Sequence, residues 1–315
     1  MYIFSSETTP SENQSITHSI LTAAEVSLEI KREDKLHKDV SGNKFRKLKY
    51  NLLEAKRSGF KTILTFGGAF SNHIAATAAA GKIMGLQTIG VIRGDELGRN
   101  LDKTLSENDT LQFASKEGMR FKFISREHYR NKTSSLFLEE LKHEFGSCYI
   151  IPEGGTNPLA IKGCEEILTP NDKSYDIICC AVGTGGTITG IINSAEIHQT
   201  VIGFPALKGN FLTEEIKKYT SKTNWKLIEE YHFGGYGKIN QEGIEFINRF
   251  NKEQHILLDP VYTGKMIYGI FDLIQKGVFK KNTRILAIHT GGLQGIAGMN
   301  ERLKKKKLPL ITIGY

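Results

Sequence analysis

The chain has 315 residues, of which 39% are hydrophobic and 24% are charged, and its formal net charge is +8. A chain of this length buries a core without metals or disulfides, so the small metal- and disulfide-stabilised classes are excluded. We expect an ordinary globular protein of one large domain or two. Glycine is frequent, with 32 copies against 7 prolines, which predicts tight turns or backbone packed against a ligand.

Much of the positive charge comes from scattered lysines and from one run, Lys304 to Lys307, near the C-terminus. No aromatic residues interleave with this run, and no nucleic-acid motif surrounds it. We interpret it as the solvated end of a helix, where lysines complement the helix dipole, and expect no nucleic-acid partner.

Compartment and membrane signals are few. The four cysteines lack the C-x-x-C spacing of metal and redox sites, so we expect reduced core residues in a cytoplasmic protein without a metal. Residues 1–10 have no basic region followed by an apolar one, so no signal peptide is expected. The longest uncharged stretch, 177–195, is interrupted by glycines and threonines, which predicts a strand, a turn and a helix rather than a membrane span.

In chain order, apolar segments of β-rich composition alternate with segments of helical pattern. The expected strands cover 62–66, 87–92, 120–124, 147–151, 176–181, 200–204 and 284–289. The expected helices cover 43–58, 72–84, 158–168, 187–196, 214–220, 241–250 and 265–276. Most of the strand segments are continuously apolar, as is typical of strands buried on both faces. The alternation predicts an α/β fold with mainly parallel sheets flanked by helices.

Proline and glycine combine at 151–158, which predicts a passage between two α/β units with a ligand site in the cleft. Glycine-containing loops follow several expected strands, where α/β proteins bind ligands. The loop 66–73 offers Ser71 and Asn72 to an anion. The loop 182–190 predicts a phosphate site, and it matches neither the ATP nor the dinucleotide pattern. The loops 259–265 and 289–292 are weak signals on their own.

Lys44 follows a glycine and an asparagine at the start of an expected helix. An amine at such a place can be desolvated, which lowers its pKa as a Schiff-base nucleophile requires. Spacing alone does not single it out, because Lys47 and Lys49 are close by and a basic first turn of a surface helix is the commoner explanation.

Further segments match, in order, the motifs of one known family. They are Lys31-Arg32-Glu33-Asp34, Ser41-Gly42-Asn43-Lys44-Phe45-Arg46-Lys47-Leu48, Gly67-Gly68-Ala69-Phe70-Ser71-Asn72-His73, Glu153-Gly154-Gly155-Thr156-Asn157, Gly183-Thr184-Gly185-Gly186-Thr187, Asp259-Pro260-Val261-Tyr262-Thr263-Gly264-Lys265 and His289-Thr290-Gly291-Gly292. On these segments the chain resembles the fold-type II pyridoxal-phosphate enzymes, which have a tryptophan synthase β-like fold. The resembling branch contains 1-aminocyclopropane-1-carboxylate deaminase and D-cysteine desulfhydrase.

The resemblance implies a large cofactor-binding domain of 1–46 plus 153–315, a small domain of 47–152, and pyridoxal 5'-phosphate held by Lys44 as a Schiff base. The implied cofactor-binding residues are Lys44, Asn72, Gly183, Thr184, Gly185, Gly186, Thr187, Tyr236, Thr263 and Thr290. The implied substrate-binding residues are Ser71, Asn72, His73, Tyr236 and Tyr262, of which Ser71 and Tyr262 join Lys44 as catalytic residues.

The resemblance also implies individual roles. Gly183 to Thr187 would bind the cofactor phosphate, and Asn72 would hydrogen-bond its phenolic oxygen. Ser71 and His73 would face the substrate carboxylate. Tyr236 would lie beside the cofactor ring, and Tyr262 would act as an acid or base.

The chain departs from the deaminases of this family at two positions, Thr263 and Thr290, where they carry an acid and a leucine. A carboxylate facing the pyridine nitrogen keeps the ring a strong electron sink, and a hydroxyl sustains that less well. Opening a cyclopropane demands more of the ring than loss of a good β-leaving group. The threonine pair therefore favours D-cysteine desulfhydrase-type β-elimination, which gives pyruvate, ammonia and sulfide.

Two alternatives stay open from the sequence. One is a true 1-aminocyclopropane-1-carboxylate deaminase, or an eliminase for another D-amino acid. The other is a non-catalytic pyridoxal-phosphate-binding or basic scaffold protein, supported only by the lysine run. We expect a small amino-acid substrate, no membrane and, as is usual for the resembling family, a homodimer.

Overall fold

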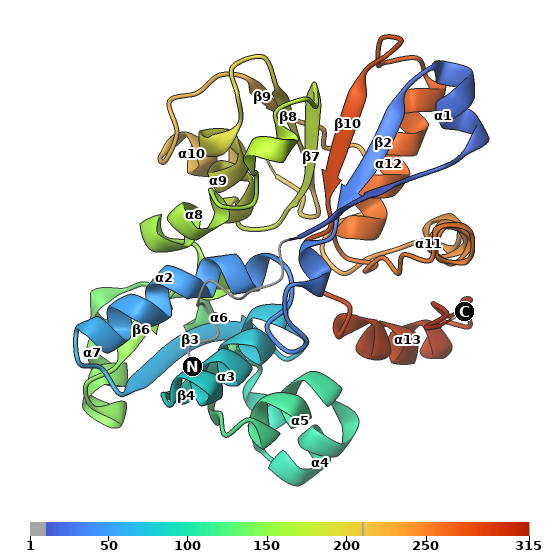
Figure 1. Cartoon of the computed structure of the whole chain (residues 1–315). Coiled ribbons are helices and arrows are strands. Elements are labelled where there is room, and N and C mark those ends of the chain that lie inside the picture. The colour runs from blue at the N-terminus through green and yellow to red at the C-terminus, as the bar shows by residue number, and fades with distance from the viewer. Residues whose placement is uncertain (1–10, 210, 315) are drawn as a thin grey trace.

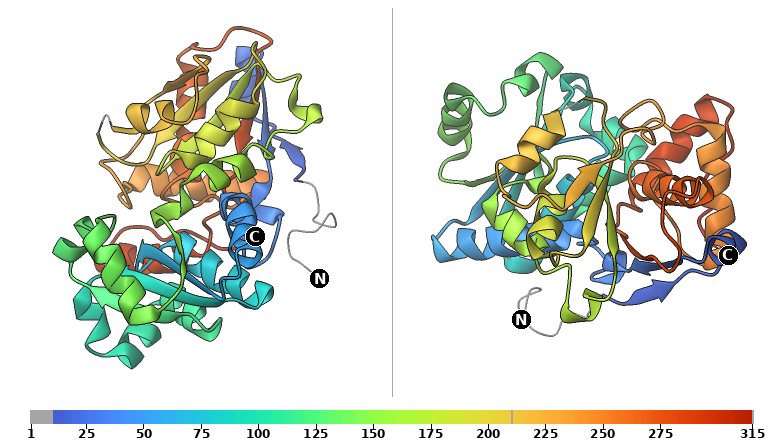
Figure 2. Two further views of the ribbon diagram at one scale, coloured as in Figure 1. Left: turned by 90° about the vertical axis from the view of Figure 1, so that its left-hand side faces the viewer. Right: turned by 90° about the horizontal axis from the view of Figure 1, so that it is seen from above.

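The computed structural model describes residues 11–209 and 211–314, which form two lobes, each built around a sheet (Figure 1). The expectation about a signal peptide falls on residues 1–10, which lie outside the described residues. The left-hand view of Figure 2 shows the same two lobes from the side, with the helix α2 (Asn43–Arg57, blue) where they meet.

The larger sheet has the strand order β1-β2-β10-β7-β8-β9. Its strands are β1 (Asn13–Ser15), β2 (Ser27–Lys31), β7 (Ile177–Val182), β8 (Thr200–Pro205), β9 (Trp225–Leu227) and β10 (Arg284–Ile288). All neighbours run parallel except β1 and β2. The central strands are buried on both faces, which explains why their sequences are continuously apolar.

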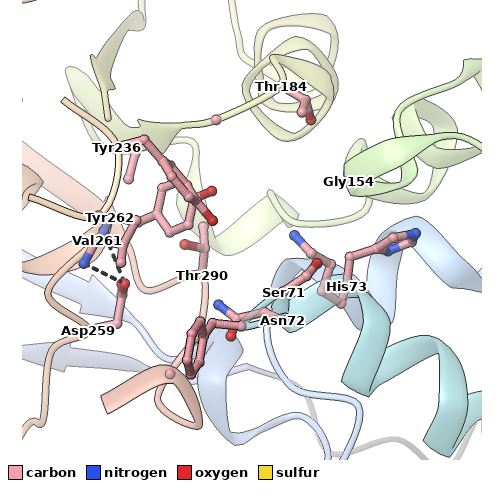
Figure 3. Close-up of a pocket in the computed structure, with 18 of the residues that line it drawn as sticks. Ser71, Asn72, His73, Gly154, Thr184, Tyr236, Asp259, Val261, Tyr262 and Thr290 are labelled. Carbon is pink, nitrogen blue, oxygen red and sulfur yellow. Dashed lines mark hydrogen bonds between the residues drawn. The ribbon is translucent and has the colours of Figure 1, made fainter. Parts of the chain in front are cut away.

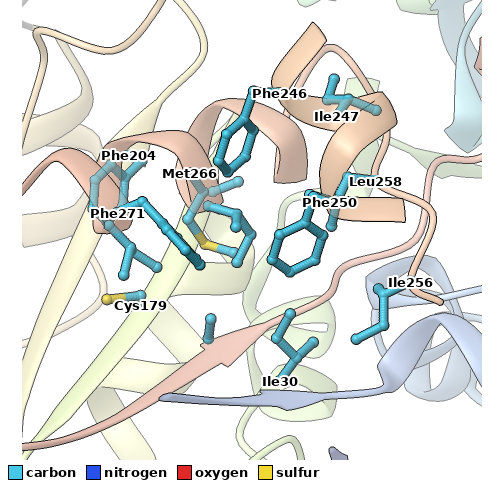
Figure 4. Close-up of a cluster of buried hydrophobic side chains, with 14 of the residues drawn as sticks. Ile30, Cys179, Phe204, Phe246, Ile247, Phe250, Ile256, Leu258, Met266 and Phe271 are labelled. Atoms are coloured by element: carbon cyan, nitrogen blue, oxygen red, sulfur yellow. The ribbon is translucent and has the colours of Figure 1, made fainter. Parts of the chain in front are cut away.

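Helices cover both faces of this sheet, and alternate side chains of β10 pack against the two helix layers. Ile285 and Ala287 point to a cluster shared with α1 (Ser19–Ala24), α11 (Gln241–Gln254), α12 (Thr263–Gln275) and α13 (Gly295–Lys305). Leu286 and Ile288 point to the opposite cluster, shared with α8 (Pro158–Cys164), α9 (Gly186–Ser194) and α10 (Phe211–Lys217). Figure 4 shows the aromatic centre of the first cluster, where Phe246 and Phe250 of α11 pack near Phe271 of α12.

The smaller sheet is entirely parallel, with the order β5-β4-β3-β6. Its strands are β3 (Thr62–Gly68), β4 (Gln87–Arg93), β5 (Arg120–Ile124) and β6 (Tyr149–Ile151). Ile63 of β3 packs with α2 and α3 (Asn72–Met84), and Leu64 packs on the other face with α6 (Arg126–Arg130) and α7 (Ser135–Phe145). The helices α4 (Leu101–Glu107) and α5 (Asp109–Lys116) complete this lobe.

Short 3-10 turns join these elements. They are η1 (Glu33–Lys35), η2 (Asp95–Gly98), η3 (Glu153–Gly155) and η4 (Pro170–Asp172).

The predicted α/β fold with mainly parallel sheets is confirmed, and every expected strand and helix is present with small shifts at its ends. The stretch 177–195 is β7, a glycine turn and α9, as predicted. The domain limits at 46/47 and 152/153 stay a prediction; the first falls inside α2, which runs on as one helix. Lys304 and Lys305 form the exposed end of α13, as expected of the lysine run.

Within the described residues, no helix is both long and apolar enough to cross a bilayer. In the same part of the chain, no group of three or more His, Cys, Asp or Glu side chains is arranged to hold a metal ion.

Candidate active site

A cavity of about 520 Å³ is lined by both lobes, at the carboxyl ends of strands from both sheets. The loop after β3, the glycine loop after β7 and the loop after β10 all contribute to its wall, together with the first turn of α2 and the segment that leads into α12. Sequence segments about 250 residues apart therefore meet in one place, as the predicted cleft site requires.

Lys44 lies in the first turn of α2 and lines the cavity. Gly42 precedes it with φ +63°, and a Cβ there would lie 2.0 Å from the carbonyl oxygen of Thr290, so only glycine allows α2 to start so close to the end of β10. The Nζ of Lys44 donates to Asn43 Oδ1 at 3.1 Å. Burial, aided by the positive charge of Lys47, lowers the pKa of Lys44 to about 7.

The predicted phosphate loop ends β7 and begins α9 at Gly186. Gly185 has φ +87°, and the backbone N–H groups at the start of a helix favour an anion. Thr187 is held in place because its Oγ1 accepts a hydrogen bond from Asn43 Nδ2 at 2.8 Å. Gly183, Thr184, Gly185 and Thr187 line the cavity. The structure does not bring Gly186 to the cavity wall, because its α-carbon packs against Thr156.

Lys47 contacts this glycine loop, and the sequence did not single it out. It lines the cavity, and its buried Nζ donates to Gly154 O at 2.9 Å, Thr156 Oγ1 at 3.1 Å and Thr184 Oγ1 at 3.4 Å. Burial lowers the pKa of its amine. Lys44 and Lys47 are three residues apart and so share a helix face, which is the signal that could have identified Lys47.

Ser71 and Asn72 begin α3 and lie on the side of the cavity opposite Tyr236 and Tyr262 (Figure 3). Ser71 caps the helix, and its Oγ accepts the N–H of Ile74 at 3.4 Å. The Oδ1 of Asn72 is buried and has no hydrogen-bond partner among the described residues. A buried amide oxygen without a partner is costly, so it indicates a place where a ligand supplies a donor.

His73 lines the edge of the cavity, and its ring is turned away from the two tyrosines (Figure 3). Thr65 Oγ1 donates to Ile151 O at 2.9 Å, so its contact of 2.8 Å with His73 Nε2 makes that nitrogen the donor. His73 Nδ1 is then an acceptor, and burial together with Lys44 and Lys47 lowers the ring's pKa well below its usual value. A neutral acceptor nitrogen does not bind a carboxylate, so the geometry does not suit the role expected of His73.

Tyr262 and Tyr236 meet edge to face in the cavity, with ring centroids 6.1 Å apart. Burial raises the pKa of Tyr262 well above its usual value, so its phenol stays protonated. Its backbone N–H donates to Asp259 Oδ2 at 3.0 Å. Asp259, which the sequence did not single out, also accepts the N–H of Val261 at 2.9 Å and so holds the turn that carries Tyr262 (Figure 3).

Of the two threonines expected beside the cofactor, the structure brings only Thr290 to the cavity wall. Thr263 is fully buried behind it. Its hydroxyl donates to Asp259 Oδ1 at 2.8 Å and accepts the N–H of Asp259 at 2.9 Å, so both its hydrogen-bonding functions are used within the protein. The structure does not bring Thr263 to the cavity wall, because its hydroxyl is bonded to Asp259 in the turn that begins α12, and its contact with the cofactor stays a prediction.

These residues fit the groups of pyridoxal phosphate. A buried amine with a pKa of about 7 can bind an aldehyde, and the glycine loop with the Lys47 ammonium can hold a phosphate. The unpartnered Asn72 Oδ1 matches a ligand with a hydroxyl group on its ring.

Comparison with known proteins agrees with this geometry. A family model described as pyridoxal-phosphate dependent enzyme matches residues 18–291. A Pyrococcus horikoshii protein, provisionally named a 1-aminocyclopropane-1-carboxylate deaminase, is 34% identical over 294 residues, covering 87% of each chain. The bifunctional D-cysteine desulfhydrase/1-aminocyclopropane-1-carboxylate deaminase, mitochondrial, of Arabidopsis thaliana is 33% identical over 292 residues, covering 85% of this chain and 72% of that one.

Among solved structures, that of an ACC deaminase homologue is similar, with a TM-score of 0.79 and 28% identity over 94% of both chains. An O-ureido-L-serine synthase shares the fold alone, with a TM-score of 0.66 at 16% identity over 91% of both chains. The chain therefore belongs to the pyridoxal-phosphate dependent enzymes of fold type II, in the branch of the 1-aminocyclopropane-1-carboxylate deaminase and D-cysteine desulfhydrase relatives, and its cofactor is pyridoxal phosphate.

Proposed function

We propose that this enzyme removes the β-substituent and the amino group from a small amino acid, with D-cysteine as the first candidate. In the overall reaction D-cysteine and water give pyruvate, ammonia and sulfide. Pyridoxal phosphate, when bound, supplies an electron sink for the negative charge that develops at the substrate α-carbon. The protein's own residues bind, orient and move protons.

Lys44 is the residue we propose to bind the cofactor and then to remove the α-proton. A pKa of about 7 leaves a large neutral fraction of its amine near neutral pH, as a base requires. Asn43 Oδ1, at 3.1 Å from Nζ, is the acceptor that orients the amine. The start of α9 would hold the phosphate together with Lys47, whose longest bond, of 3.4 Å to Thr184 Oγ1, is the one to be exchanged for a phosphate oxygen. A phosphate held there keeps the reacting atoms next to Lys44.

Ser71 suits the substrate carboxylate. Its hydroxyl oxygen already accepts the N–H of Ile74, so its hydrogen is left to donate to a ligand, at the positive end of the 13-residue helix α3. Tyr262 suits the leaving group, because burial keeps its phenol protonated and able to give a proton to a departing sulfur.

The observation that carries β-elimination is that no free carboxylate lines the cavity within the described residues. The lining holds Asp259, which accepts the N–H groups of Tyr262 and Thr263, and Glu153, which pairs with Lys132 at 3.1 Å. Without a free acid at the ring nitrogen, the electron sink is weaker. A weaker sink suits loss of a good leaving group better than opening of a cyclopropane.

Ring opening of 1-aminocyclopropane-1-carboxylate to 2-oxobutanoate and ammonia is the second candidate, favoured by the printed names of the relatives. The two are separated by measuring kcat/KM for pyruvate formation from D-cysteine and for 2-oxobutanoate formation from the cyclopropane, side by side. We expect D-cysteine to be preferred, and a higher kcat/KM for the cyclopropane contradicts the proposal.

The matched controls for this assay are two lysine variants of α2. Lys44→Ala removes the amine in the cavity and should abolish both activities. Lys49→Ala removes an equal charge that pairs with Glu166 at 2.7 Å outside the cavity, and should retain them.

A homodimer and a cytoplasmic location stay predictions.

A further inference from the structure

Two positive charges in the cavity wall are left without a partner once the cofactor's needs are met. The cationic lining residues are Lys44, Lys47, Arg93 and Arg302. The two lysines serve the proposed cofactor site, and both lining carboxylates are engaged by other groups. Neither arginine forms an ion pair or a hydrogen bond to a carboxylate within the described residues.

Arg93 is the last residue of β4, and it pairs in register with Gly68 at the end of β3. A Cβ placed on Gly68 would lie 3.7 Å from Arg93 Nη2, so the guanidinium extends over the start of the loop that carries Ser71. Its Cζ also lies 5.8 Å from the ring centroid of Tyr129, a cation–π distance that favours this direction of the side chain.

Arg302 comes from the opposite end of the chain, on α13. A Cβ placed on Gly237 would lie 3.3 Å from Arg302 Nη1, so this guanidinium lies against the loop that follows Tyr236. Arg93 and Tyr236 line the same cavity. Tyr236 is 50% exposed, so this loop forms the mouth of the cavity.

Gln294, at the N-terminus of α13, is exposed, lines the same cavity and adds amide donors. The two carboxylates that line the cavity, Glu153 and Asp259, are engaged by Lys132 and by backbone N–H groups, so neither is paired with Arg93 or Arg302. Low-dielectric walls strengthen the field of unpaired charges in such a cleft, and guanidinium groups match the geometry of carboxylate and sulfonate oxygens.

We propose that Arg93 and Arg302 form an anion subsite that selects small amino acids carrying a second acidic group on the side chain. The inference rests on the proposed function in that the α-amino and α-carboxylate groups bind at Lys44 and Ser71. The side chain then points to the cavity mouth, where the second acid meets the arginines.

The test compares two amino acids that differ in one acidic group, alanine and aspartate, each as D- and L-isomer. Their dissociation constants for the cofactor-loaded protein are measured by calorimetry, which needs no turnover. We expect the wild type to bind the better aspartate isomer at least about tenfold more tightly than the matching alanine. Arg93→Met and Arg302→Met should each lower this preference for aspartate over alanine, by a factor of up to about ten. The double variant should bind the two amino acids about equally.

Arg99→Met is the control, because it removes an equal charge from an exposed residue near β4 that does not line the cavity, and it should leave the ratio intact. The proposed subsite is overturned if the wild type binds aspartate and alanine equally well, or if the double variant keeps the wild-type preference for aspartate. The proposed function fails separately, when D-cysteine yields no pyruvate while the aspartate preference persists.

Discussion

Replacing Lys47 by methionine should weaken cofactor binding while the chain still folds. Methionine keeps much of the buried length of the lysine side chain but removes the ammonium that bonds Gly154 O, Thr156 Oγ1 and Thr184 Oγ1. The two threonine hydroxyls lie 2.6 Å apart and can still bond each other, which limits the cost to the free energy of unfolding.

The loss in affinity follows from the bond that Lys47 would give the phosphate in exchange for its long contact of 3.4 Å with Thr184 Oγ1. A charge-assisted hydrogen bond to a phosphate contributes about 1.5–3 kcal/mol. That range corresponds to a dissociation constant for pyridoxal phosphate raised by about 10- to 150-fold. A second effect falls on Lys44, because the positive charge of Lys47 helps burial to lower its pKa to about 7. Lys47→Met should therefore shift the pKa of Lys44 upward, toward its usual value.

Both effects are measured by titrating the apoprotein with pyridoxal phosphate and following the cofactor absorbance over a range of pH. Lys49→Met is the control, since Lys49 bonds the Glu166 carboxylate at 2.7 Å outside the cavity. An affinity within about twofold of wild type, together with an unshifted pH midpoint, refutes the placement of Lys47 at the phosphate.

Two further variants test the structure around Lys44. Gly42→Ala should lower the free energy of unfolding, measured with denaturant, by about 3 kcal/mol or more, because the new Cβ would clash with Thr290. Gly59→Ala is the control, since Gly59 also has a positive φ but open space around it, and it should cost about 1 kcal/mol. Equal losses in the two variants would contradict the contact with Thr290. Lys44 should make the apoprotein more stable as pH rises from about 7 to 10.5, because over that range the unfolded chain binds more protons. Lys44→Met should flatten this slope; an identical slope contradicts the lowered pKa.

How much of the fold the sequence predicts depends on how each strand is buried. The continuous apolar run of β7 is visible because both of its faces are covered within the sheet. The strand β2 is not visible as an apolar run, since it carries Glu29 and Lys31. The buried Lys31 is neutralised by Asp172, whose Oδ2 lies 2.8 Å from its Nζ, a partner 141 residues away that no local pattern shows.

The site shows the same limit. The glycine loop after β7 and the Ser71 cap are local motifs, so sequence alone places them at helix starts beside a ligand. Thr263 is different, because its hydroxyl could face a cofactor or bond another part of the protein. Only the folded turn shows that it donates to Asp259. Arg302 reaches the cavity only through the docking of α13, which no spacing rule predicts.

The helix α2 touches both lobes, and this gives Lys44 a mechanical setting. Its first turn is tied to the larger sheet, because the N–H of Asn43 donates to Thr290 O at 3.2 Å and Arg46 pairs with Glu33 at 2.8 Å. Its later turns, with Leu52, pack into the core of the smaller lobe. If the lobes rotate relative to each other about this helix, Lys44 lies close to the rotation axis and moves less than Ser71, which belongs to the smaller lobe. The cavity can then open and close while the position of the Lys44 amine changes little.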